Sequence, residues 1–223
     1  MKSAIITFPG SNCDRDMRVA IKKVTGKEPI SVWHGDHTLP DSLDFIALPG
    51  GFSYGDYLRS GAIAAKSPIM SEIKKAADTG VFILGVCNGF QILTEAGLLP
   101  GTLMRNDKLN FICKTTALNI ENNETAFTNA YADDASALNI PVAHHDGSYF
   151  IDDEGLEALR ANNQIAFTYA NENINGSKGA IAGVLNEKKN VLGMMPHPER
   201  VVEAETGGTD GIRLFESVIK SIA

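Results

Sequence analysis

The sequence has few cysteines, no long apolar run and no cluster of basic residues, and each absence excludes a class of protein. Three widely spaced cysteines in 223 residues cannot form a paired disulfide framework, and no CxxC pair indicates a zinc site. No apolar stretch approaches the roughly 20 residues that span a membrane, and the apolar run at the N-terminus is too short for a signal peptide. A net charge of -7 without a basic run argues against nucleic-acid binding. The composition favours a cytosolic protein with reduced thiols.

Short apolar runs alternate with helical patterns in the first half of the chain. The runs at 4–8, 30–33 and 45–48 are each followed by turn residues, as strands usually are. The run at 81–86 is apolar throughout, which is typical of a central parallel strand buried on both faces. Such alternation predicts a doubly wound α/β sheet, with ligands bound beyond the carboxyl ends of its strands.

Two helix starts are predicted in this half. Asn12 or Asp14 is placed to cap a helix whose apolar residues recur at i, i+4 and i+7. Ser67 is placed to cap a second helix, with Pro68 at its first position.

The second half has weak helical periodicity, and strand-like runs at 111–120 and 165–169 are separated by turn clusters. These runs predict hairpins or meanders. No linker, repeat or low-complexity segment divides the chain. We therefore predict one domain over residues 1–223, with a mostly parallel sheet, helices on both faces and an antiparallel extension in the second half.

Cys87 lies where a buried strand meets a helix. Gly85 and Gly89 flank it, and an apolar helical segment follows at 90–96. This is the nucleophile-elbow pattern with cysteine in place of serine, in which the glycines relieve a strained backbone. The helix N-terminus also favours a thiolate. A buried structural cysteine is the alternative, and the surrounding glycines argue against it.

The other two cysteines are weaker candidates. Cys13 also occupies a strand-to-helix turn, but its neighbours are Asn12 and Asp14, and an adjacent carboxylate disfavours a thiolate. Cys113 falls inside an alternating strand run and is predicted to contribute to packing.

A cysteine nucleophile needs a proton acceptor, and His197 is the best placed of five histidines. Prolines on both sides keep this segment extended, so that Glu199, two residues on, points to the same side and can support the imidazole. The His144–His145 pair is the competing candidate. Two adjacent histidines without a third ligand are weak evidence for a metal site, and we predict none.

Attack on a carboxamide creates an oxyanion that needs backbone N–H donors. Pro49-Gly50-Gly51-Phe52 follows a predicted strand, so the amide of Gly51 or Phe52 is one candidate donor. The amide of Asn88, directly after the nucleophile, is the second. An ordinary turn is the alternative for the Gly-Gly pair.

Three motifs together match a known family. Residues 49–51, 85–91 and 196–199, with the sequences Pro-Gly-Gly, Gly-Val-Cys-Asn-Gly-Phe-Gln and Pro-His-Pro-Glu, resemble those of the class I, or triad, glutamine amidotransferases. The resemblance implies that glutamine is the substrate.

The same resemblance implies roles for four residues. Cys87 would be the nucleophile, His197 the base and Glu199 the residue that orients the base. Gln91 matches the family glutamine that contacts the bound substrate.

A narrower resemblance, to the separate glutaminase subunits of purine biosynthesis, covers essentially the whole chain. It is carried by residues 8–14, 50–59, 141–144 and 193–200. One departure is visible at 145–147, where His-Asp-Gly replaces the usual Gly-Glu-Gly. We expect that loop near the substrate or near an interface.

This resemblance also implies partners. The chain contains no G-x-x-x-x-G-K-[ST] loop, so an ATP-consuming step belongs to another polypeptide. The implied partners are a synthetase subunit, which would bind ATP and magnesium, and a small accessory subunit. No cofactor is expected in this chain.

Three other functions remain open. A cysteine hydrolase or peptidase of related fold would often place its histidine soon after the cysteine, and none follows Cys87 before His144. A regulatory module with a dead site is disfavoured by the intact Cys, His and Glu set. An amidotransferase subunit could also serve a different synthetase.

Overall fold

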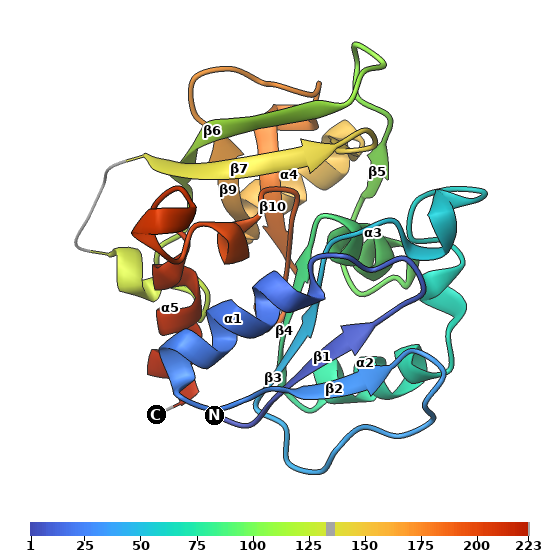
Figure 1. The fold of residues 1–223 in the computed structure, drawn as a ribbon. Helices are drawn as coiled ribbons and strands as arrows, with labels where there is room; N and C mark the ends of the chain where they lie inside the picture. The colour runs from blue at the N-terminus through green and yellow to red at the C-terminus, as the bar shows by residue number, and fades with distance from the viewer. Residues whose placement is uncertain (133–136, 223) are drawn as a thin grey trace.

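The computed structural model describes residues 1–132 and 137–222, and a nine-stranded sheet runs through them (Figure 1). Its strand order is β2-β1-β3-β4-β11-β10-β9-β6-β7. The first five of these are mutually parallel: β2 (Ile30–Trp33), β1 (Ser3–Thr7), β3 (Phe45–Leu48), β4 (Phe82–Val86) and β11 (Val191–Met194). The other four join by antiparallel pairing: β10 (Ile181–Leu185), β9 (Ile165–Tyr169), β6 (Ile112–Ile120) and β7 (Leu138–His144). The predicted parallel sheet with an antiparallel extension is confirmed.

Helices cover both faces of the parallel part, as predicted. On one face α1 (Asp14–Thr25) packs against α5 (Ile212–Ile222), while α2 (Ile69–Asp78) and α3 (Asn88–Glu95) lie on the other face (Figure 1). A small second sheet pairs β5 (Thr102–Met104) with β8 (Ser148–Phe150). Among the described residues, no helix is long and apolar enough to cross a membrane.

The sheet centre explains the apolar runs of the sequence. All four residues of β3 are buried, and β4 is buried from Ile83 to Val86, because helices cover both of their faces. β4 lies between β3 and β11, so the segments that leave the carboxyl ends of these three strands meet at one edge of the sheet. The predicted strands at 30–33, 45–48 and 165–169 have the observed bounds.

Both predicted helix caps are wrong. Cys13 directly precedes α1 without a side-chain cap, and the Asn12 carboxamide oxygen accepts a hydrogen bond from the Cys13 thiol instead. Pro68 occupies the N-cap position of α2. The Ser67 hydroxyl is engaged elsewhere, 3.1 Å from Nδ1 of His34.

The sequence did not predict α4 (Asp153–Ala161), and it predicted the wrong environment for Cys113. Only Leu156 and Leu159 of α4 are buried, so its apolar pattern is too short to show a helical period. Its capping residue, Asp152, accepts a hydrogen bond from the Gly155 N–H. Cys113 is exposed, because β6 lies next to the edge strand of the sheet and presents much of its length to solvent.

Candidate active site

Cys87 occupies the junction between β4 and α3 in a strained backbone conformation. Its φ of 50° and ψ of -106° are rarely adopted by residues other than glycine. A Cβ on Gly89 would overlap the Leu48 carbonyl, and one on Gly85 would lie 2.7 Å from the backbone of Gly89. Only glycines at these two positions let α3 begin so close to β3 and β4. The structure therefore contains the sharp turn that the sequence predicts.

His197 and Glu199 follow β11 and are paired in the interior. Nδ1 of His197 lies 2.6 Å from Oε1 of Glu199, and the residues are 1% and 2% exposed. The His197 backbone N–H donates to the Pro141 carbonyl at 2.8 Å, which ties this segment to β7. Within the described part of the chain, Nε2 of His197 has no hydrogen-bond partner. The imidazole is thus held through one nitrogen, and the other is left for chemistry.

The surroundings of His197 raise its pKa. Burial by itself lowers the pKa, but the Glu199 carboxylate and the nearby thiols of Cys87 and Cys13 oppose it. The pKa of His197 comes to lie well above its ordinary value. Its imidazole is therefore a proton donor near neutral pH.

Three side chains converge on Gly50, which follows β3. A Cβ at this position would lie 2.8 Å from Cε1 of His197, 3.1 Å from Sγ of Cys13 and 3.4 Å from Cβ of Cys87. The fold therefore brings Cys87 and His197 together as predicted, from two neighbouring strands. It also brings Cys13 there. From the sequence, Cys13 is considered only as an alternative nucleophile. Its position after β1 nevertheless predicts that it lies at the same edge of the sheet as Cys87.

The backbone N–H groups near Cys87 differ in whether they already donate a hydrogen bond. The Phe52 N–H, one of two candidate donors in its turn, is taken by the Gly10 carbonyl at 3.0 Å. Among the described residues, none accepts a hydrogen bond from the N–H of Gly51 or of Asn88. Asn88 is the first residue of α3, where N–H groups have no partner within the helix. Gly51 and Asn88 are therefore the amides left to bind an anion.

Gln91 is buried next to the loop at residues 145–147, where the sequence departs from the pattern of the family it resembles. Its Nε2 donates to the Asp146 carbonyl at 2.6 Å, and its Oε1 accepts from Nδ2 of Asn88 at 2.9 Å. The Asp146 carboxylate accepts from the Ser60 hydroxyl at 3.0 Å and pairs with Arg105 at 3.3 Å. The departing loop therefore holds the predicted substrate-contact residue directly.

Asp56 lies beside this network with an altered pKa. Burial, and next the negative charge of Asp146, raise the pKa of Asp56 to about 6, although the Ser60 hydroxyl partly opposes them. Nδ2 of Asn88 lies 3.5 Å from its Oδ1. The loop that carries Asp56 thus contacts the residue that follows the nucleophile.

The two adjacent histidines have different environments. His144 is buried, its Nδ1 lies 3.1 Å from Oδ1 of Asn106, and burial followed by the charge of His197 lowers its pKa to about 4. His145 pairs with Asp146 at 3.4 Å. In residues 1–132 and 137–222, neither belongs to a group of three possible metal ligands.

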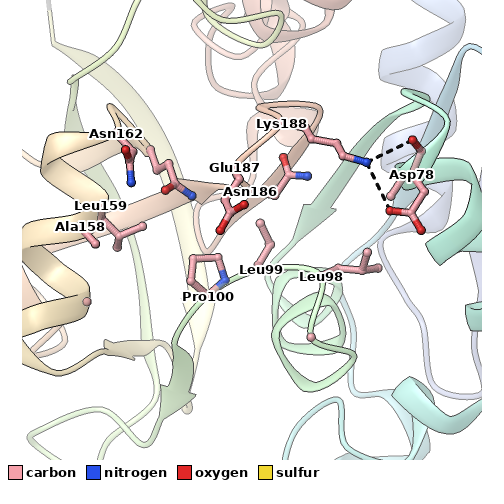
Figure 2. A pocket seen from close by; sticks show the side chains of 14 residues that line it. Asp78, Leu98, Leu99, Pro100, Ala158, Leu159, Asn162, Asn186, Glu187 and Lys188 are labelled. Atoms are coloured by element: carbon pink, nitrogen blue, oxygen red, sulfur yellow. Dashed lines mark hydrogen bonds and ion pairs between the residues drawn. The ribbon is translucent and has the colours of Figure 1, made fainter.

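A separate pocket of about 470 Å³ lies away from Cys87 (Figure 2). It is lined by the end of α2, the segment that follows α3, α4 and the turn between β10 and β11. It therefore opens at the edge where the parallel strands begin. Lys188 and Asp78 pair across its rim at 3.4 Å (Figure 2). None of the predicted site residues lines it.

Comparisons with known proteins identify the same kind of protein over nearly the whole chain. Residues 1–209 match the model of the CobB/CobQ-like glutamine amidotransferase domain. The subunit PurQ of phosphoribosylformylglycinamidine synthase from Novosphingobium aromaticivorans is 61% identical over 220 residues, which are 99% of this chain and 97% of the relative. The corresponding subunit of Zymomonas mobilis is 55% identical over 223 residues, all of both chains.

A solved structure also matches this chain over its full length. One chain in the structure of PurLQS from Thermotoga maritima is 47% identical, with a TM-score of 0.89. The match covers 100% of this chain and 99% of that one.

Proposed function

The chain belongs to the family of CobB/CobQ-like glutamine amidotransferase domains, and we propose that it is the glutaminase subunit of phosphoribosylformylglycinamidine synthase. In this role it hydrolyses glutamine to glutamate and ammonia for purine biosynthesis. The relatives that carry this name match the chain over nearly their full length. The observation that carries the chemistry is the convergence of Cys87 and the buried His197–Glu199 pair at one edge of the sheet.

The first half-reaction is acylation of the enzyme. The Cys87 thiolate attacks the side-chain carbonyl carbon of glutamine, and the oxygen becomes an oxyanion. The free N–H groups of Gly51 and Asn88 stabilise this charge. Protonated His197 gives its proton to the leaving nitrogen, the C–N bond breaks, and ammonia and a glutamyl thioester result.

The second half-reaction is hydrolysis. Neutral His197 removes a proton from water, which attacks the thioester and releases glutamate and the Cys87 thiolate. Glu199 holds Nδ1 of the imidazole throughout, so that the other nitrogen carries each proton. The raised pKa of His197 suits the donor step, because the ring is protonated when the amide must leave.

Substrate binding involves Gln91, whose buried side chain links α3 to the loop at Asp146. Phe52, 46% exposed beside the Gly51 amide, would line the entrance with its ring. We assign no cofactor to this chain. Its three free cysteines support a cytosolic location, where thiols stay reduced. One sheet through both halves supports a single domain over residues 1–223.

The partners follow from the assembly that the Thermotoga relative forms. PurL, the synthetase subunit, and PurS, the small accessory subunit, would complete the enzyme. PurL would bind ATP and magnesium and use the ammonia to convert formylglycinamide ribonucleotide to formylglycinamidine ribonucleotide. Ammonia must then pass between subunits without escaping to solvent.

Reconstitution tests this function. The chain is combined with PurL and PurS, and product formation is measured with glutamine or with ammonium as the nitrogen source. Cys87→Ser should abolish the glutamine-dependent rate and leave the ammonia-dependent rate. If the chain does not assemble with these partners, it serves a different synthetase. If the variant keeps its glutamine-dependent rate, the nucleophile is wrong.

A further inference from the structure

Cys13 lies beside the catalytic residues, but neither half-reaction uses it. The residue is 1% exposed, and its sulfur lies within 4.8 Å of a ring nitrogen of His197 and of a carboxylate oxygen of Glu199. We propose that Cys13 is a positioning residue for His197. Its sulfur supports the imidazole at a second place, so that the nitrogen not bonded to Glu199 stays directed at Cys87. This role deepens the proposed glutaminase function and rests on it.

A single hydrogen bond does not fix an imidazole ring. Glu199 holds Nδ1 of His197 at 2.6 Å, and the ring can still pivot about that contact. The described residues offer Nε2 no hydrogen-bond partner, so other atoms must limit the movement of the ring. A Cβ on Gly50 would lie 2.8 Å from Cε1 of His197 and 3.1 Å from the Cys13 sulfur. The Gly50 backbone and the Cys13 sulfur therefore border the imidazole together.

Cys13 is itself held firmly enough to act as a support. Its backbone N–H and that of Asn12 donate to the Gly50 carbonyl at 3.2 and 3.3 Å. Its thiol donates to Oδ1 of Asn12 at 3.1 Å, and its sulfur accepts from Nη2 of Arg200 at 2.9 Å. A cysteine that only fills space behaves as a small apolar residue and needs no such contacts. The donor and the acceptor of this thiol are both in use, which fixes its orientation.

Arg200 connects this support to the segment that carries the base. It directly follows Glu199, and its guanidinium reaches the turn before α1, where it contacts Cys13. Nε of Arg200 also lies 3.4 Å from Oδ2 of Asp16. Residues 197–200 are thereby tied to the start of α1, at the position where the Cys13 sulfur borders the imidazole.

Cys13 also contributes to the protonation of His197. Burial lowers the pKa of His197, while Glu199, Cys87 and Cys13 raise it. The other charged or titratable groups around this position are Arg200, Asp16 and His144. Removing the Cys13 sulfur should therefore lower the pKa of His197 even when Glu199 stays in place.

The first experiment observes His197 directly and needs neither glutamine nor a synthetase. The isolated full-length chain is isotopically labelled at histidine Cε1, and pH titrations followed by nuclear magnetic resonance give the pKa of His197. Cys13→Ala should lower this pKa, and Cys13→Ser, whose hydroxyl can keep both contacts of the thiol, should lie closer to native. Cys113→Ala, which removes an exposed thiol, is the matched control and should titrate like the native chain. The native pKa in Cys13→Ala would mean that the sulfur does not support the ring.

The second experiment measures catalysis in the reconstituted complex. Cys13→Ala should lower kcat for glutamine by about tenfold or more with a smaller change in KM, because a small displacement of a catalytic group is costly. Cys13→Ser should recover most of that loss. If the thiol only filled space, serine would be at least as harmful as alanine, because it would bury a hydroxyl in an apolar site. The ammonia-dependent rate should stay native in both variants, which shows that they fold and assemble.

Two kinetic results would overturn the proposal. A native kcat in Cys13→Ala, or a serine variant no better than the alanine variant, would leave Cys13 with a packing role only. A different result would overturn the assigned function instead. If the native chain turns over no glutamine with its partners, while His197 titrates as expected in the native and Cys13→Ala proteins, the support by Cys13 stands and the glutaminase assignment fails.

Discussion

Nδ1 of His197 lies 2.6 Å from the Glu199 carboxylate, and both side chains are buried. This contact assigns the two ring nitrogens to different tasks. Nδ1 fixes the orientation of the ring, and Nε2 remains free to move protons. Both half-reactions depend on this one arrangement.

Glu199→Gln tests the orienting role. The amide keeps the size of the side chain but loses the charge that stabilises the imidazolium. We expect kcat for glutamine to fall by about 10²–10⁴-fold, with a much smaller change in KM. Steady-state kinetics of the reconstituted complex measure both. Glu187→Gln, at an exposed position far from Cys87, is the control and should be unchanged. A variant within twofold of native would contradict the role.

The raised pKa of His197 predicts how stability changes with pH. A histidine whose folded pKa exceeds its unfolded value stabilises the protein fully below the unfolded pKa, about 6.5. This stabilisation is lost as pH rises through the folded pKa. The free energy of unfolding should therefore decrease above pH ~6.5, and less steeply in Glu199→Gln. Urea titrations at several pH values test this. Parallel curves for the two proteins would show that Glu199 does not raise the pKa.

The raised pKa of Asp56 predicts that replacing this residue stabilises the protein at neutral pH but not at acidic pH. Its pKa is raised to about 6 by burial and by Asp146, so the ionised form is disfavoured in the folded state. The stabilising contribution of the neutral carboxyl is present below the unfolded pKa and lost as pH rises through about 6. Asp56→Asn should raise Tm by about 2 °C at pH ~7 and have little effect at pH ~4. Thermal unfolding of the isolated chain measures this. An equal effect at both pH values would contradict the cause.

Gly50→Ala tests whether the close approach of His197 to Gly50 is needed for catalysis. The new methyl group would lie 2.8 Å from Cε1 of His197, so the imidazole must move. Misplacing a catalytic group by about 1 Å can cost about 10²-fold in rate, and we expect a loss of that size in kcat. Gly35→Ala is the control, because its methyl group meets only the half-exposed Trp33 ring. A native rate in Gly50→Ala would mean that the contact does not constrain His197.

Much of the fold follows from local sequence. The apolar runs of β3 and β4 predict buried parallel strands because helices on both faces leave no polar side. The short helix α4 is different. Two buried leucines and one capping aspartate are too weak a local pattern to predict a helix. The predicted helix cap at Ser67 is wrong because its hydroxyl contacts His34 instead, and the local sequence does not reveal this contact.

Some residues of the site are likewise predictable from the local sequence, and others are not. The positions of Cys87 and His197 are predictable because glycines and prolines restrict the backbone around each residue. The Phe52 amide is a candidate oxyanion donor from the sequence, but in the structure it donates its hydrogen bond to the Gly10 carbonyl of another loop. Cys13 joins the site through the order of the strands, which places β1 beside β3. Contacts of this kind depend on topology, and no local pattern reports them.

Labelling with an electrophilic glutamine analogue tests the central claim most directly. The reconstituted complex is incubated with the analogue, and the adduct is located by peptide mass spectrometry. Our account predicts one adduct, on Cys87, and its loss in His197→Ala. An adduct on Cys13 would contradict the account, because the buried second thiol and not the elbow cysteine would then be the nucleophile.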